Sequence, residues 1–270
     1  MSAGSCATTS PSASACPPMS GEPPVAGGGV RYTPGRVAHV VFDRPRVKNA
    51  LDAECWRLLA GALEAFAGDG GARVLVLSGA GGEFSSGADL SGGINGSAEQ
   101  VTAKMREITS IVVALYAMPK PTVAKVDGVA VGVGMSLALG CDLVLASDRA
   151  RFGAVFSRHG MTPDGGLSWL LPRMVGAHKA KELTLLGKLI GAAEARDLGL
   201  VNRVVPAGEL DAVADEWCDR LAQVAPTAAA GTLELIDGAW DIPFTEALER
   251  EAESQRRAVA ALREAGKTGP

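Results

Sequence analysis

The sequence has few aromatic residues, little excess charge and no long apolar run. Aromatics make up 4% of the 270 residues, and no stretch of 18 consecutive residues is apolar, which predicts no membrane-spanning helix. The net charge of −4 gives no sign of the basic surface that nucleic-acid-binding proteins carry. A hydrophobic content of 47% still allows a sizeable core, built mainly from Ala, Val and Leu. We therefore expect neither a nucleic acid nor a membrane as partner.

Cysteines are few, odd in number and irregularly spaced. The five lie at positions 6, 16, 55, 141 and 218. This spacing matches neither a zinc site nor a disulfide framework, so no metal site is expected. Free thiols in a reducing cytoplasm are the natural interpretation.

The first 30 residues contain no Lys or Arg and are rich in Ser, Pro, Ala and Gly. A signal peptide needs a basic start and an apolar stretch, and neither is present. Such a composition buries too little apolar surface to offset its ordering entropy, so we predict a disordered tail over residues 1–30. Met19 is an alternative start. The remainder is predicted to divide into a core over residues 31–205 and a helical region over residues 206–270.

Beyond the tail, apolar strands alternate with amphipathic helices, and helices alone come last. The predicted strands are Val37–Phe42, Arg73–Ser78, Thr122–Val126, Cys141–Ser147 and Val201–Val205. The predicted helices are 52–67 with Asp52 as cap, Glu99–Ala117, Gly132–Gly140, Gly166–Met174, His178–Leu186, Ala192–Leu198, Leu210–Val224, Ala228–Ala239 and Phe244–Glu264. This order predicts an α/β core followed by a helical segment. The long loop at residues 80–96 is a candidate functional segment.

The most informative stretch joins a strand to a helix through glycines. Thr122–Gly140 reads TVAKVDGVAVGVGMSLALG. The first residues of a helix carry unpaired N–H groups and the positive end of the helix dipole. Gly132 and Gly134 keep side chains away, so a ligand oxygen can approach the Val133 N–H. The arrangement suits an anion or a developing oxyanion.

Other interpretations of this stretch fit less well. A dinucleotide fingerprint requires glycine at position 137, where Leu137 stands, and a phosphate loop requires Gly-Lys-Ser/Thr. A serine-hydrolase elbow would use Ser136, which falls inside the predicted helix and not at the turn. A glycine-rich packing point between strand and helix is the structural alternative.

Seven motifs in order make the chain resemble the crotonase (enoyl-CoA hydratase/isomerase) family over roughly residues 31–257. They are Arg44–Leu51 (RPRVKNAL), Phe84 with Gly87-Ala88-Asp89, the Gly132-x-Gly134 turn, Cys141-Asp142, Phe152-Gly153, Leu171–Gly176 and Ala195–Val201. The resemblance implies a crotonase spiral of ββα units closed by C-terminal helices. It also implies assembly as homotrimers or dimers of trimers. The N–H groups of Ala88 and Val133 match the family's oxyanion-hole positions.

The chain departs from the family's hydratases at both catalytic glutamates. Ser136 stands two residues after the Gly-x-Gly turn, and Phe156 stands three residues after Phe-Gly. Addition of water generally needs one group to activate the water and another to handle the carbon-bound proton. Double-bond isomerisation, which one carboxylate can perform as a proton shuttle, is therefore preferred over hydration.

Asp164 is the carboxylate that remains. Some family members place a catalytic carboxylate at this position. Among them are the ring-epoxide phenylacetyl-CoA isomerases, which this stretch of the sequence resembles most. An apolar site, supplied by Phe156 and Trp169, should raise its pKa. The alternative is that Asp164 only caps the following helix. His159, five residues earlier, is a candidate to orient Asp164 or to act as a second acid/base, although a surface or packing role is the commoner use.

The resemblance places coenzyme A, as part of the substrate and with no separate cofactor, along Val47, Lys48 and Ala50, and then Ala88, Asp89 and Leu90. The lysine that family members often carry after Ala-Pro, and their closing Phe-x-x-Lys-Arg-x-Pro, are missing. A substrate whose acyl group is attached to a carrier protein, and not to coenzyme A, is therefore an alternative. The function predicted is double-bond isomerisation of an acyl-CoA thioester. The alternatives are a hydratase or dehydratase with atypical acid/base residues, and a non-catalytic acyl-thioester-binding partner subunit.

Overall fold

The computed structural model describes residues 28–93, 97–264 and 266. Its strands are β1 Val30–Thr33, β2 Val37–Phe42, β3 Val74–Gly79, β4 Thr122–Val126, β5 Val129–Val131, β6 Leu143–Ser147, β7 Arg151–Gly153, β8 Leu189–Gly191 and β9 Arg203–Val205. Its α-helices are α1 Ala53–Gly68, α2 Ala98–Tyr116, α3 Val133–Leu139, α4 Leu167–Val175, α5 Ala177–Leu185, α6 Ala192–Asp197, α7 Leu210–Gln223, α8 Pro226–Asp237 and α9 Phe244–Glu264.

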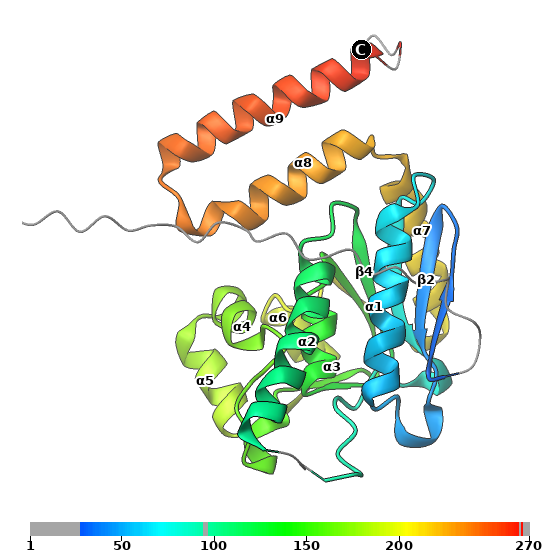
Figure 1. Ribbon diagram of the computed structural model, residues 1–270, viewed down its shortest axis with the longest axis vertical. Helices are drawn as coiled ribbons and strands as arrows, with labels where there is room; N and C mark the ends of the chain where they lie inside the picture. The colour runs from blue at the N-terminus through cyan, green and yellow to red at the C-terminus, as the bar shows by residue number, and fades with distance from the viewer. Residues whose placement is uncertain (1–27, 94–96, 265, 267–270) are drawn as a thin grey trace, which may run out of the picture.

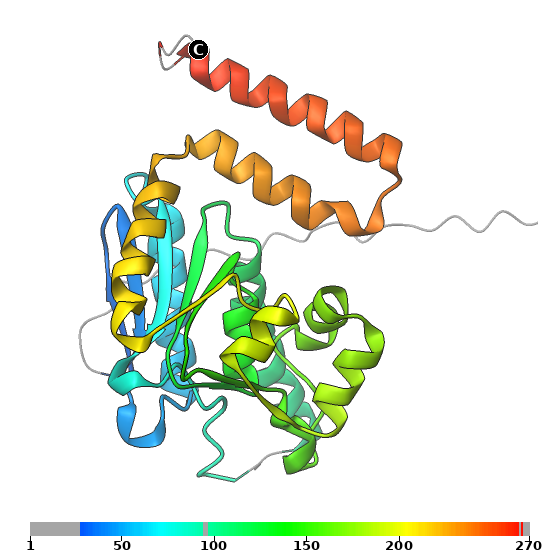
Figure 2. The same cartoon turned by 180° about the vertical axis from the view of Figure 1, so that it is seen from behind.

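A six-stranded sheet forms the centre, in the order β1-β2-β3-β4-β6-β9. All neighbouring strands are parallel except β1 and β2, which are antiparallel. Parallel strands are covered on both faces, and β3 shows this in its unbroken buried run from Val74 to Ser78. Helices α1, α2 and α3 lie over one face, and α7 packs on the other through Leu210, Ala214 and Cys218 (Figures 1 and 2).

A second sheet of three short strands, β5-β7-β8, lies beside the first. The chain passes from β4 in the large sheet to β5 in the small sheet and then into α3. It repeats this path from β6 to β7, after which it enters α4 and α5 through a 3-10 turn at Val155–His159. These ββα units bring the starts of α3 and α4 to the same region of the molecule.

The last two helices, α8 and α9, form a hairpin that projects from one end of the core (Figures 1 and 2). They pack on each other, yet large apolar side chains stay exposed along and beside them, including Ile236 at 62%, Trp240 at 57% and Phe244 at 76%. Among the described residues, no helix is both long and apolar enough to cross a membrane.

Most predicted elements are present. Strands β2 and β4 and helix α9 have the predicted bounds, and Asp52 caps α1 by accepting a hydrogen bond from the Cys55 N–H at 2.9 Å. Four strands, β1, β5, β7 and β8, were not predicted, because three or four residues are too few for a periodic signal. Cys141 and Asp142 precede β6, so the predicted strand began two residues early.

Three of the five cysteines, Cys55, Cys141 and Cys218, are free and buried, as expected. Cysteines 6 and 16 lie outside the described residues. So does most of the predicted tail, and Val30 is already the first residue of β1.

Candidate active site

The first element of the site is the loop after β3, which carries Ala88. Ser85 joins this loop to β5, because its N–H donates to the Val129 carbonyl and its carbonyl accepts from Val131. On the other side, Leu51 N–H donates to the Gly87 carbonyl at 2.8 Å and Asp89 N–H to the Leu51 carbonyl at 2.9 Å. Ala88 is thus held from both sides, while its own N–H has no acceptor among the described residues.

The second element is the turn from β5 into α3. Gly132 adopts φ +55°, a conformation that glycine reaches without strain, and α3 begins at Val133. The Val133 N–H also lacks an acceptor within the described part of the chain. A Cβ atom on Gly87 would lie 3.5 Å from the Val133 nitrogen and 2.8 Å from the Val131 oxygen. Glycine at 87 therefore allows the two loops to meet and leaves the Val133 N–H accessible.

The third element is the segment that carries Asp164 into α4. Gly165 and Gly166 both have positive φ, and Gly166, not Asp164, is the N-cap of α4. No side chain caps this helix, so the capping role considered for Asp164 is wrong. The Asp164 Oδ1 atom is buried and has no hydrogen-bond partner. Burial alone raises the pKa of the Asp164 carboxyl to about 6.

These three elements line one small cavity of about 70 Å³. Its walls are formed by Ser86, Gly87, Ala88, Leu90, Gly132, Val133, Val155, Phe156, His159, Met161 and Asp164. Two residues whose N–H groups have no acceptor, and a carboxyl whose Oδ1 has no donor, among the described residues, therefore line the same cavity. Such a set can hold a carbonyl oxygen and exchange a proton with a carbon near it.

The surroundings of Asp164 differ in part from those expected. Phe156 lines the cavity as predicted, but Trp169 does not. Its indole packs edge-on against Tyr116 and under the Arg173 guanidinium, 3.9 Å from the ring centroid, in a different cavity. His159 lines the site and is exposed, yet no hydrogen bond joins it to Asp164 in the described structure.

The segments predicted to bind coenzyme A lie side by side. Ser86 N–H donates to the Lys48 carbonyl at 2.8 Å, and the Ser86 hydroxyl donates to the Val47 carbonyl at 3.0 Å. Val47 is 44% exposed, whereas Ala50 is buried and accepts a hydrogen bond from Arg44 at 2.7 Å. The Lys48 ammonium pairs with Glu83 at 3.1 Å, so it is already neutralised on this surface.

Asn49 is a residue of this region whose role the sequence did not reveal. Its Oδ1 accepts from the Arg44 N–H at 2.8 Å, and its Nδ2 donates to the carbonyls of Ala80 and Glu83. The residue is buried and has φ +56°, next to Lys48 with φ +51°. Two adjacent left-handed residues are strained, and the three hydrogen bonds of Asn49 hold them in place. The motif Asn-Ala-Leu contained this signal, because Asn tolerates a left-handed backbone best among residues with side chains.

Asp89 has a structural environment. It accepts a hydrogen bond from the Ser91 N–H at 3.0 Å and one from the Arg44 guanidinium at 2.9 Å. These bonds, led by that from Ser91, lower the pKa of Asp89 to about 2. Its carboxylate therefore stabilises the loop through these hydrogen bonds. Its neighbours Ala88 and Leu90 line the cavity, and Asp89 itself does not.

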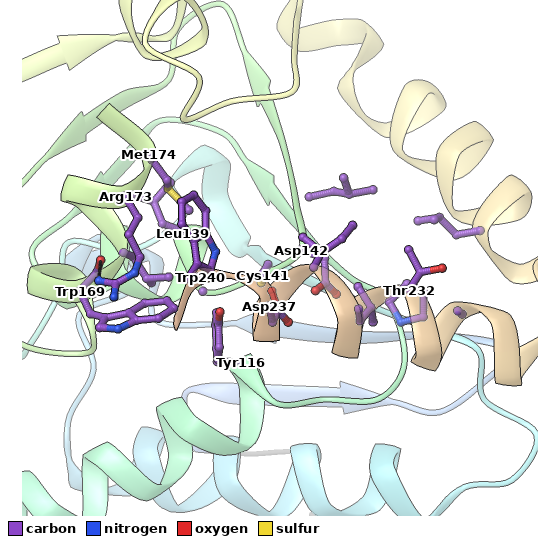
Figure 3. Close-up of a pocket in the computed structure, with 18 of the residues that line it drawn as sticks. Tyr116, Leu139, Cys141, Asp142, Trp169, Arg173, Met174, Thr232, Asp237 and Trp240 are labelled. Carbon is purple, nitrogen blue, oxygen red and sulfur yellow. Dashed lines mark hydrogen bonds between the residues drawn. The ribbon is translucent and has the colours of Figure 1, made fainter. Parts of the chain in front are cut away.

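A larger cavity of about 590 Å³ lies at the opposite end of α3, under α8 (Figure 3). Its walls are mainly apolar, and its polar members include Tyr116, Asp142, Arg173, Thr232 and Asp237. It contains neither Ala88, Val133 nor Asp164. Size alone would favour this cavity, but the unpaired donors and the unpaired carboxylate are in the smaller one.

Comparison with known proteins gives one consistent result. A family model described as Enoyl-CoA hydratase/isomerase matches residues 33–265. A protein of Rhodobacter capsulatus named probable enoyl-CoA hydratase is 40% identical over 149 residues, or 55% of this chain and 57% of that protein. The 1,2-epoxyphenylacetyl-CoA isomerase of Escherichia coli is 38% identical over 155 residues, or 56% of this chain and 59% of that protein. The matched stretch thus spans less than two thirds of either relative.

Among solved structures, a Thermobifida fusca protein in complex with CoA superimposes with a TM-score of 0.83 and 31% identity, over 90% of this chain and 99% of that chain. The fold of this chain therefore matches that of the Thermobifida fusca protein over 90% of its length.

Proposed function

Because the chain belongs to the enoyl-CoA hydratase/isomerase family, we propose that it binds an acyl-CoA thioester and shifts a double bond in the acyl chain. The thioester carbonyl oxygen accepts hydrogen bonds from the N–H groups of Ala88 and Val133. These donors stabilise the negative charge that forms on this oxygen when a proton leaves the acyl chain, and one such preorganised donor typically contributes about 3–4 kcal/mol in the transition state.

Asp164 carries the proton in this scheme. Its ionised carboxylate removes a proton from the α or γ carbon of the acyl chain, and the electron pair of that C–H bond moves into the enolate. The protonated carboxyl then returns the proton to the other carbon, and the double bond shifts. No atom is gained or lost, and one carboxyl is sufficient.

The observation that carries the proposal is the unpartnered, buried Oδ1 of Asp164, in the cavity that also holds the two free N–H groups. A buried carboxylate normally has hydrogen-bond partners, and one without them in a cleft is a candidate for chemistry. Isomerisation is preferred over hydration because Ser136 and Phe156 occupy the positions of the hydratases' glutamates, and neither carries a carboxylate.

A hydratase or dehydratase that uses Asp164 together with His159 is the second candidate. It is supported by the position of His159, which lines the same cavity from its exposed rim. A non-catalytic acyl-thioester-binding subunit remains the third candidate, and the experiment below distinguishes all three.

We further propose assembly as a homotrimer or a dimer of trimers. The exposed apolar side chains Ile236, Trp240 and Phe244 at the turn of the α8–α9 hairpin would be covered by a second copy. Light scattering coupled to size-exclusion chromatography should then give three or six times the monomer mass. A monomer at micromolar concentration would contradict this.

The function is tested by proton exchange in D₂O with a panel of 2-enoyl-, 3-enoyl- and phenylacetyl-type CoA thioesters. Deuterium uptake at the α or γ carbon without a gain of water supports isomerisation, and Asp164→Asn should abolish it. A gain in mass of one water supports the hydratase. No exchange with any thioester overturns the catalytic proposal and favours the partner subunit.

The oxyanion role of Val133 is tested by Val133→Pro. Proline is tolerated at the first position of a helix, so the variant removes the N–H donor with little damage to α3. We expect exchange to slow by about 10²–10³-fold. Val133→Ala keeps the N–H and is the matched control, and an equal loss in both variants would argue against the donor.

A further inference from the structure

Ser136 lies one turn beyond Val133 on α3, and its side chain is completely buried. Its hydroxyl donates to the Asp164 carbonyl oxygen at 2.9 Å, and the Gly132 carbonyl oxygen lies farther away at 3.4 Å. The same Asp164 carbonyl accepts the Leu167 N–H at 3.1 Å, which closes the turn into α4. One serine thus connects the helix that presents the Val133 N–H with the turn that presents the Asp164 carboxyl.

The two segments also touch directly. A Cβ atom on Gly165 would lie 2.8 Å from the Ser136 Cβ and 3.0 Å from a methyl carbon of Val133. Contacts this short leave no room for a side chain at 165, and Gly165 also has φ +59°. The backbone after Asp164 therefore rests on α3, beside the fully buried Ser136.

From this geometry we propose that Ser136 is a positioning residue, which fixes the Asp164 carboxyl relative to the Val133 N–H through the hydrogen bond to the Asp164 backbone. The inference rests on the proposed function of Asp164. It also explains why the residue at 136 is small, because a glutamate there would displace the turn that carries Asp164.

A defined change in activity follows from loss of this bond. The Ser136 hydroxyl is the side-chain group that donates to the Asp164 carbonyl, so its loss removes a restraint on this turn. Small displacements of a reacting group lower rates strongly, and a misplacement of about 1 Å can cost about 10²-fold. A looser turn also admits water to the carboxyl, which lowers the pKa of Asp164 toward its ordinary value.

The test uses Ser136→Ala, with Ser147→Ala as matched control. Ser147 is equally buried and donates to Asp127 at 2.6 Å, in another part of the molecule. For Ser136→Ala we expect proton exchange to slow about 10- to 100-fold with little change in KM, and the midpoint of its pH profile to move downward. Ser147→Ala should leave the rate and the pH profile unchanged, even if it lowers stability.

Two further variants keep the inference falsifiable if Ser136→Ala folds poorly. Gly165→Ala leaves the Ser136 hydroxyl in the sequence but pushes the turn away from α3 by contact with Ser136 and Val133, and it should reproduce the loss of rate. Ser136→Glu should be inactive, since it displaces Asp164. Exchange that is normal in Ser136→Ala but absent in Asp164→Asn would overturn the positioning role alone. Normal exchange in Asp164→Asn would instead overturn the proposed function. Full activity of Ser136→Glu would also overturn the positioning role.

Discussion

Two half-buried aspartates lie near opposite ends of α3, and they differ in their hydrogen bonds. Asp142, just after the helix, accepts from the N–H and the hydroxyl of Thr122, each at 2.7 Å. Its own N–H donates back to the Thr122 hydroxyl at 2.9 Å. Asp164, near the start of the helix, has an Oδ1 atom without any partner. Burial nevertheless raises the pKa of both carboxyls to about 6.

The comparison teaches that a raised pKa does not by itself identify a reactive carboxyl. At Asp142 the hydrogen bonds from Thr122 oppose the effect of burial and Asp237 adds to it, whereas at Asp164 burial is the only cause. The side chain of Asp142 connects the end of α3 to β4, and its cavity is the one under α8 (Figure 3). Unused hydrogen-bonding capacity, and not titration, separates the two sites.

The largest expected difference is in activity. Asp164→Asn should slow proton exchange by about 10³-fold, because the amide cannot accept the proton. Asp142→Asn keeps an oxygen that can accept from Thr122 and should remain within a factor of a few of the wild type. The measurement is deuterium uptake under saturating thioester. A comparable loss in both variants would mean that Asp142 also belongs to the site.

Loss of stability should be larger for substitution of Asp142 than of Asp164, the reverse of the order expected for activity. Asp142→Ala removes the Oδ2 atom that accepts both hydrogen bonds from Thr122, whose buried N–H is then unpaired, and should lower the free energy of unfolding by about 3 kcal/mol. Asp164→Ala removes no hydrogen bond of its carboxyl Oδ1 and should have a much smaller effect. Urea unfolding of both variants checks this. Should Asp164→Ala be the more destabilised, its carboxyl would have a structural role that the contacts do not show.

The contrast between the aspartates also marks what could be read from the sequence. The sequence predicted the strand-to-helix turn at Val133, the loop at Ala88 and the carboxyl at Asp164, because glycines and ordered motifs reveal backbone geometry. It did not predict which neighbour each side chain meets. Trp169 lies in the first turn of α4, three residues after Gly166, and packs on Tyr116 of α2. How α4 is rotated against α2 decides this contact.

The bond between Ser136 and Asp164 was hidden for the same reason. It joins residues 28 positions apart. The donor is a hydroxyl, which every serine has, and the acceptor is a backbone carbonyl, which every residue has. No composition or spacing marks such a pair. Likewise, Cys141-Asp142 was recognised as a motif, but the partner of Asp142, Thr122, is evident only from the structure, where β4 lies next to the end of α3.

The pH dependence of turnover sharpens the comparison further. Asp164 must be ionised to remove a proton, so kcat/KM should rise with pH and level off above a midpoint near the pKa of about 6. At one unit below the midpoint the rate should be about tenfold below the plateau. Asp142→Asn should leave this profile in place. If the midpoint moved in Asp142→Asn, the titrating group would be Asp142 and not Asp164.

The smallest expected effect concerns the stability of Asp164→Asn. The pKa of Asp164 is raised from 3.8 to about 6 on folding, so the folded protein holds a proton that the unfolded chain releases between these values. Stability contributed by the neutral carboxyl is present below pH 4 and is lost as pH rises through 6. Asn has no charge to bury, so at pH 7 the variant should be more stable than the wild type by about 1 kcal/mol, after allowance for solvent screening. The difference should vanish below pH 4, which thermal unfolding at the two pH values can measure. If the wild type were instead the more stable at pH 7, the carboxylate would have a partner in the folded protein, and the distinction between the two aspartates would fail.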